Sequence, residues 1–207
     1  MRLKPVIKRA IVLMGLLAVS ACLKAPSPQP PATLLISIDT STEPELAYAT
    51  AFLDEFAFQS GRYEWLVVDI QKDETVANQY SNIPRKEAVD ELLQALTQER
   101  SDDQALLASL AHAREYALRL EPDESLTVVL LTEGTHNAET LQSLEAMSQE
   151  LSTFPHFRLF VAGVSEDNRL PLSRAFTPIE DQVQFFGDGL VELDELLSVL
   201  SARSRQS

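Results

Sequence analysis

The feature that most constrains this chain is a short apolar run, residues 34–38, which stops abruptly at Asp39 and a hydroxyl-rich turn. Apolar runs of this length bounded by turn residues are typical of buried strands rather than helices. Strands that are apolar on both faces belong to parallel sheets covered by helices. The loop after such a strand is where open α/β sheets bind ligands. We therefore expect a first strand that delivers Asp39 and Ser41 to a ligand-binding edge.

The amino terminus has the composition of a targeting segment. Residues 1–21 begin with Arg2, Lys4, Lys8 and Arg9 and continue with an uncharged apolar run over residues 10–21. This run is about a dozen residues, well short of the roughly 20 that span a bilayer. We interpret residues 1–21 as a signal peptide that does not contribute to the fold.

The end of this segment, Val19-Ser20-Ala21-Cys22, resembles the bacterial lipoprotein box. That resemblance implies cleavage before Cys22 and attachment of lipid, including palmitate, to this residue. The alternative is an ordinary buried or disulfide-bonded cysteine, but the chain has one cysteine and therefore no intrachain partner. Leu23 stands where inner-membrane lipoproteins carry aspartate, so the resemblance favours the outer membrane over the inner membrane.

Residues 22–32 are predicted to be a tether. They contain four prolines, Pro26, Pro28, Pro30 and Pro31, a composition that prefers the extended polyproline geometry. At ~3 Å per residue, about ten residues would hold a domain about 30 Å from a membrane surface.

The remaining residues, 33–203, have the length of one domain. The formal net charge of the chain is -14, and removal of the four positive charges of the signal segment makes it -18. Such a surface repels nucleic acid, so no nucleic-acid partner is expected. The sequence shows no zinc-ligand spacing, no phosphate-binding glycine loop and no nucleophile elbow.

Apolar patterning predicts strands that alternate with helices. Strands are expected over residues 34–38, 63–70, 75–80, 126–131, 157–164 and 183–186. Helices are expected over residues 42–59, 85–98, 106–120, 139–151 and 190–200. This alternation is typical of an α/β fold with a doubly wound, mostly parallel sheet and helices on both faces.

Several of these segments resemble the von Willebrand factor type A (VWA) domain family. Asp39-Thr40-Ser41 resembles the opening of the family's Asp-x-Ser-x-Ser motif, and residues 128–134 resemble its fourth strand, which runs into Thr-Asp-Gly. Residues 157–164 are similar to its fifth strand, and residues 185–188 to its closing strand. The resemblance implies a six-stranded sheet of order 3-2-1-4-5-6 with one antiparallel edge strand. Asp39 and Glu133 would then lie across one crevice.

In this family the crevice holds a divalent cation, so the resemblance implies Mg²⁺ or Mn²⁺ bound by Asp39, Ser41 and Glu133, with Glu43 and Asp103 as further ligands. Such ions prefer oxygen ligands. The chain departs from the family pattern in three places: Glu43 replaces a serine, Glu133 replaces an aspartate, and residues 101–104 lack a threonine.

Each of these residues also has a purely structural interpretation. Ser41 and Glu43 suit the start of a helix for capping and dipole reasons. Asp39 would accept hydrogen bonds from the turn, and Glu133 would be a solvated turn residue.

The sequence thus predicts a membrane-anchored VWA-like module of the bacterial cell envelope that binds another envelope protein. The alternative is a metal-free structural or assembly subunit of an envelope complex. A hydrolytic enzyme is the least favoured class, because no nucleophile, base and orienting group can be recognised together.

Overall fold

The computed structural model describes residues 32–39, 43–57, 65–72, 75–81, 94 and 105–203. The signal peptide, Cys22, nearly all of the tether, Ser41 and Asp103 lie outside the described residues. So does the helix expected over residues 85–98, except for Gln94, which is helical.

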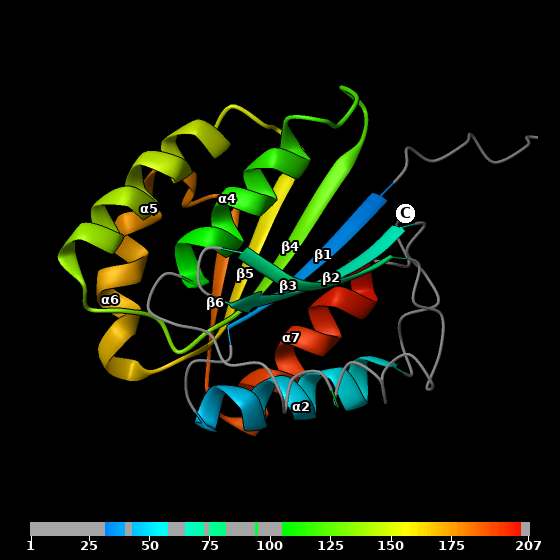
Figure 1. The fold of residues 1–207 in the computed structure, drawn as a ribbon, viewed down its shortest axis with the longest axis vertical. Coiled ribbons are helices and arrows are strands. Elements are labelled where there is room, and N and C mark those ends of the chain that lie inside the picture. The colour runs from blue at the N-terminus through cyan, green and yellow to red at the C-terminus, as the bar shows by residue number, and fades with distance from the viewer. Residues whose placement is uncertain are drawn as a thin grey trace, which may run out of the picture.

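One sheet runs through the described part of the chain (Figure 1). Its strands lie in the order β3-β2-β1-β4-β5-β6, and all neighbours are parallel except β2 and β3. The bounds are β1 (Ala32–Ile38), β2 (Trp65–Lys72), β3 (Thr75–Ser81), β4 (Ser125–Leu131), β5 (Phe157–Val164) and β6 (Val183–Gly187). Strand β1 therefore has a parallel partner on each side, which buries both of its backbone edges.

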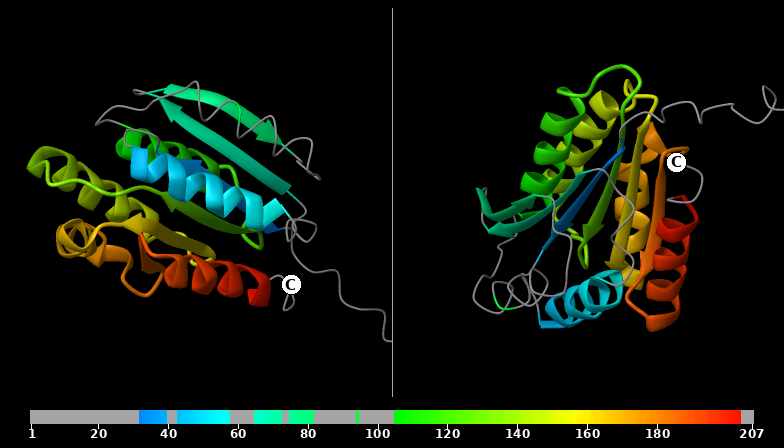
Figure 2. Two further views of the ribbon diagram at one scale, coloured as in Figure 1. Left: turned by 90° about the horizontal axis from the view of Figure 1, so that it is seen from below. Right: turned by 90° about the vertical axis from the view of Figure 1, so that its right-hand side faces the viewer.

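Helices cover both faces of the sheet (Figures 1 and 2). On one face lie α2 (Glu43–Ala57) and α7 (Leu190–Arg203). On the other lie α4 (Ala105–Ala117), α5 (Ala138–Leu151) and α6 (Glu166–Ala175), which a 3₁₀ turn, η1 (Thr177–Ile179), follows. Within the described ranges, no helix combines the length and the apolarity needed to cross a membrane.

The side chains of β1 divide between two cores. Leu34, Ile36 and Ile38 pack with α2 and α7, whereas Leu35 packs with α4 and α5 on the opposite face. All four are fully buried. Burial of one such side chain contributes about 1.5–3 kcal/mol. The uninterrupted apolar sequence of this strand therefore follows from its need to fill both layers.

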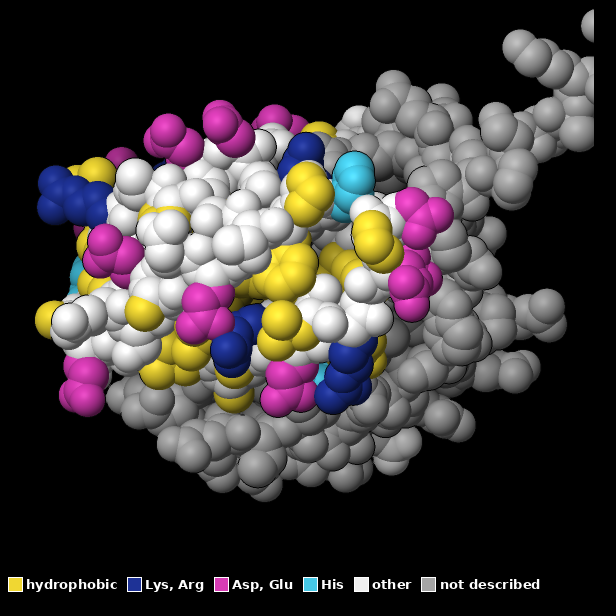
Figure 3. Space-filling view, turned by 90° about the horizontal axis from the view of Figure 1, so that it is seen from above, with side chains coloured by type: hydrophobic (Ala, Val, Ile, Leu, Met, Phe, Trp, Pro, Cys, Tyr) yellow, Lys and Arg dark blue, Asp and Glu magenta, His cyan; other side chains and the backbone are white. Residues whose placement is uncertain are grey.

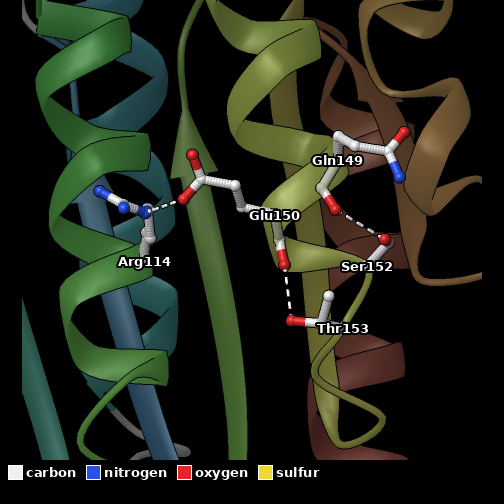
Figure 4. Close-up of polar contacts among 5 residues, drawn as sticks. All are labelled: Arg114, Gln149, Glu150, Ser152 and Thr153. Atoms are coloured by element: carbon white, nitrogen blue, oxygen red, sulfur yellow. Dashed lines mark hydrogen bonds and ion pairs between the residues drawn. The ribbon is translucent and has the colours of Figure 1, made fainter.

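Polar contacts between α4 and α5 add little to this packing (Figure 4). Arg114 of α4 forms an ion pair with Glu150 of α5, but their side chains are 40% and 55% exposed. An ion pair this exposed to solvent contributes about 0–1 kcal/mol. At the end of α5, the hydroxyls of Ser152 and Thr153 donate to the carbonyls of Gln149 and Glu150, at 2.7 and 2.8 Å. These contacts close the last turn of the helix locally.

The expected α/β class, with a parallel sheet between helices, is confirmed. The sequence patterning misses α6. This helix is rich in polar residues and contains Pro171, which breaks helical patterns because it lacks an amide donor. It ends in Leu172 and Ala175, both buried against the sheet, so tertiary packing stabilises it.

Candidate functional site

Asp39 and Thr132 meet at the carboxyl edge of the sheet. The β1–β4 register pairs Ile38 with Leu131, so the next residue of each strand lies beside the other. The Asp39 amide donates to the Leu131 carbonyl at 2.9 Å and continues the ladder one residue past the strand. Asp39 is only 5% exposed. Asp39 therefore lies buried one residue past the carboxyl end of β1.

The Thr132 hydroxyl holds the Asp39 carboxylate. Its Oγ1 donates to Asp39 Oδ2 at 3.1 Å and accepts from the Gly134 amide at 3.0 Å. Because an amide can only donate, the hydroxyl proton is left for the carboxylate. A buried carboxylate needs such a donor, since burial without partners is strongly unfavourable. Thr132 is itself buried.

Glu133 and Gly134 form a loop that is fixed to the start of α6. The Glu133 carbonyl accepts from the Ser165 amide at 3.2 Å and from Asn168 Nδ2 at 3.1 Å. Gly134 has φ +98, and a Cβ there would lie 2.7 Å from Leu172 Cδ1. Only glycine fits both the backbone angle and the space. The Glu133 side chain is partly buried in this loop, one residue beyond Thr132.

Asn168 is the site residue for which the sequence gives no signal, because α6 itself is not predicted. It is 6% exposed, and its Oδ1 has no hydrogen-bond partner among the described residues. Thr132 is also missed as a carboxylate partner. A signal for it exists, since a threonine directly after a second buried strand reaches the same sheet edge as Asp39.

Tyr48 of α2 lies on the other face of this edge. Gly163, with φ +84, lies between Tyr48 and Thr132. A Cβ at this position would be 3.4 Å from both the Thr132 carbonyl oxygen and Tyr48 Cδ1. The Tyr48 hydroxyl is buried and has no hydrogen-bond partner within the described parts of the chain. Burial, then the charges of Glu192 and Asp188, raise the pKa of Tyr48 to about 12. The phenol is therefore neutral at physiological pH.

The oxygen atoms described at this edge are of the kind that binds a hard cation, but they are only part of the predicted ligand set. Asp39 contributes a carboxylate beside the Thr132 hydroxyl, and both are oxygen ligands of the kind Mg²⁺ prefers. Among the described residues, no group of three or more His, Cys, Asp or Glu side chains is placed to hold a metal. Ser41 and Asp103 lie outside the described residues, and of Glu43 only its backbone position at the start of α2 is described.

Neither the family models nor the curated proteins contain a match to this sequence. Among solved structures, the chain is similar to the pilus adhesin SpaC from Lactobacillus rhamnosus GG, with a TM-score of 0.54 and 10% identity over 86% of this chain and 31% of the adhesin. It is also similar to proximal thread matrix protein 1 from the mussel byssus, with a TM-score of 0.48 and 13% identity over 84% of this chain and 48% of that protein. The chain thus spans about a third and a half of these proteins. At 10% identity, the likeness to the adhesin shows a shared fold alone.

Proposed function

We propose that this chain is a lipid-anchored protein-interaction module of a bacterial cell envelope, with a six-stranded, doubly wound fold like that of VWA domains. The observation that carries the proposal is the buried Asp39 carboxylate between β1 and β4. It lies where the strand order β3-β2-β1-β4-β5-β6 reverses its winding, which is the ligand-binding point of open α/β sheets. Cys22 supplies the lipid anchor, and the tether holds the domain away from the membrane, with the outer membrane favoured.

The proposed ligand at this edge is Mg²⁺ or Mn²⁺. Asp39, Ser41 and Glu133 are the proposed ligands, with Glu43 and Asp103 as further ones. The Asp39 carboxylate supports this, because it is buried next to a hydroxyl oxygen and close to a loop that carries a second carboxylate. Several carboxylates would largely neutralise one divalent ion. We therefore expect the partner envelope protein to bind through the surrounding loops rather than through an acidic side chain of its own.

A metal-free structural or assembly subunit is the second candidate, and one specific contact favours it. The Thr132 hydroxyl already donates to Asp39, and the Gly134 amide fixes that hydroxyl. A carboxylate held in this way can stabilise the β1–β4 edge without an ion. Titration with Mg²⁺ separates the two candidates, because an ion that binds only the folded state must stabilise it.

The anchor is tested at Cys22. The mature wild-type protein should partition into the detergent phase of a Triton X-114 extract, whereas Cys22→Ser should accumulate as a precursor that retains Arg2 and Lys4. Ser27→Ala, five residues further along the chain, is the matched control and should be processed normally. A wild-type protein that is soluble after processing, with an amino terminus other than Cys22, would overturn the anchor.

A further inference from the structure

A small apolar pocket lies at the amino edge of the sheet, opposite the Asp39 edge. Figure 3 shows hydrophobic side chains gathered in a hollow on this face. The pocket has a volume of about 120 Å³. Its apolar lining includes Ala117, Leu118, Leu120, Phe154, Pro155 and Phe157. Phe157 is 1% exposed, whereas Leu118 is 60% exposed. The pocket therefore has a fixed apolar interior and a leucine that projects into solvent beside it.

The rim of this pocket is acidic. Its lining includes the carboxylates Glu121 and Glu124 and the imidazole of His156, and no lysine or arginine of the described residues lines it. The rim loop is ordered by its own contacts, because the Glu121 amide donates to Glu124 Oε2 at 2.8 Å. An acidic rim disfavours anionic lipid headgroups and favours a basic group beside the apolar occupant.

The size of the pocket limits its occupant. Sites for small molecules and cofactors usually measure roughly 300–1,000 Å³. A volume of about 120 Å³ takes one or two apolar side chains of a peptide instead. Extended, proline-rich peptides dock onto aromatic-lined grooves of this kind because their geometry is already formed before binding.

The tether of this chain leaves the sheet beside the pocket. Strand β1 begins at Ala32, which pairs with Ser125, and Ser125 is adjacent to the lining residue Glu124. At ~3 Å per residue, four residues of extended chain before Ala32 cover about 12 Å. The segment of residues 23–31 carries four prolines and has Lys24 as its single charged residue. The point where this segment joins β1, and its apolar character, match the pocket.

We propose that the proline-rich segment of residues 23–31 docks its prolines into the pocket between the α4–β4 and α5–β5 loops. Covalent connection favours this occupant, since short linkers give effective concentrations in the millimolar range. A second copy of the chain is disfavoured by mutual repulsion at a net charge of -14. Docking would turn the amino edge towards the anchor and the Asp39 edge away from it. This inference depends on neither lipidation nor a bound cation.

The test places the photoreactive residue p-benzoylphenylalanine at position 118 of the full-length protein. Position 170, on α6, is the matched control, because Leu170 is 58% exposed and Leu118 is 60% exposed. After irradiation, the cross-linked peptides are identified by mass spectrometry. The proposal predicts an intramolecular link from position 118 to residues 23–31, several-fold stronger than any such link from position 170.

Replacing Pro28 and Pro30 by glycine should lower the yield of this link several-fold, whereas Ser27→Ala should leave it unchanged. A tether link no stronger at position 118 than at position 170 would overturn the proposal. So would a dominant link from position 118 to a second copy, to lipid or to another protein. An unchanged yield in the double glycine variant would also count against docking of the prolines.

Discussion

At the scale of single residues, the Thr132 hydroxyl helps to hold the buried Asp39 carboxylate. Thr132→Val keeps the shape of the side chain but removes the donor to Asp39 and the acceptor of the Gly134 amide. We expect it to lower the free energy of unfolding by about 1–3 kcal/mol, because both groups lose a buried partner. Thr132→Ser keeps the hydroxyl and should cost less. Urea unfolding at pH 7 measures the difference, and equal losses in the two variants would mean that the hydroxyl does not stabilise the carboxylate.

The raised pKa of Tyr48 should make the free energy of unfolding depend on pH in the alkaline range. Its folded-state pKa is about 12, and the pKa of an unfolded tyrosine is roughly 10. Above pH 10 the unfolded chain loses this proton before the folded chain does. The free energy of unfolding should therefore fall as pH rises from about 10 to 12, by at most about 1.4 kcal/mol per pH unit.

Tyr48→Phe isolates this contribution from the other tyrosines. The difference in unfolding free energy between wild type and variant should be constant below pH 9 and should shift against the wild type towards pH 12. At pH 7 the variant should match the wild type or exceed it by about 1 kcal/mol, since the lost hydroxyl has no described partner. Parallel pH profiles of the two proteins would contradict the shifted pKa.

At the scale of elements, most of the strands could be predicted because they are short apolar runs bounded by turn residues, and this signal lies within each strand's own sequence. The bounds of β5 agree with the prediction, and those of β4 differ by one residue. Helix α6 could not be predicted, since Pro171 and its polar residues oppose the helical pattern. Its stability comes from contacts with α5 and the sheet, which no local pattern contains. Asn168, and with it one anchor of the Glu133 loop, was missed for the same reason.

Ser148 of α5 makes a polar contact with α6 that we expect to stabilise the fold. Its buried hydroxyl lies 2.8 Å from the Ala175 carbonyl oxygen and also 2.8 Å from the Glu145 carbonyl oxygen of its own helix, so the two acceptors share one proton. Ser148→Ala should lower the free energy of unfolding by about 1–2 kcal/mol, because a buried carbonyl loses its partner. Ser152→Ala is the control, since that hydroxyl bonds only within the exposed end of α5. Thermal or urea unfolding measures both, and similar losses would show that the α5–α6 contact is not held by this bond.

At the scale of the whole molecule, the strand ends that form the candidate site can be predicted from the sequence. The side-chain contacts made there cannot. Asp39 and the Glu133 loop could be placed because parallel strands end at one edge. The contact between Asp39 and Thr132 joins residues 93 positions apart, and the contact between Asn168 and Glu133 joins residues 35 positions apart. Such pairings depend on the register and on α6 packing, which the linear pattern does not contain. The assignment of Asp39, Ser41 and Glu133 as cation ligands, with Glu43 and Asp103 as further ones, stays a prediction.

Thermal unfolding of the mature protein in detergent tests whether Asp39 belongs to a cation-binding edge. After treatment with EDTA, Mg²⁺ or Mn²⁺ is added to the wild type, to Asp39→Asn and to Asp123→Asn. Asp123 is an exposed carboxylate at the opposite edge of the sheet and serves as the matched control.

We predict that either ion raises the melting temperature of the wild type and of Asp123→Asn but leaves Asp39→Asn unchanged. At 100 times the dissociation constant, binding stabilises the folded state by about 2.7 kcal/mol, or about 5–10 °C for a domain of this size. A wild type whose melting temperature neither ion raises, or a rise of equal size in Asp39→Asn, would contradict the claim.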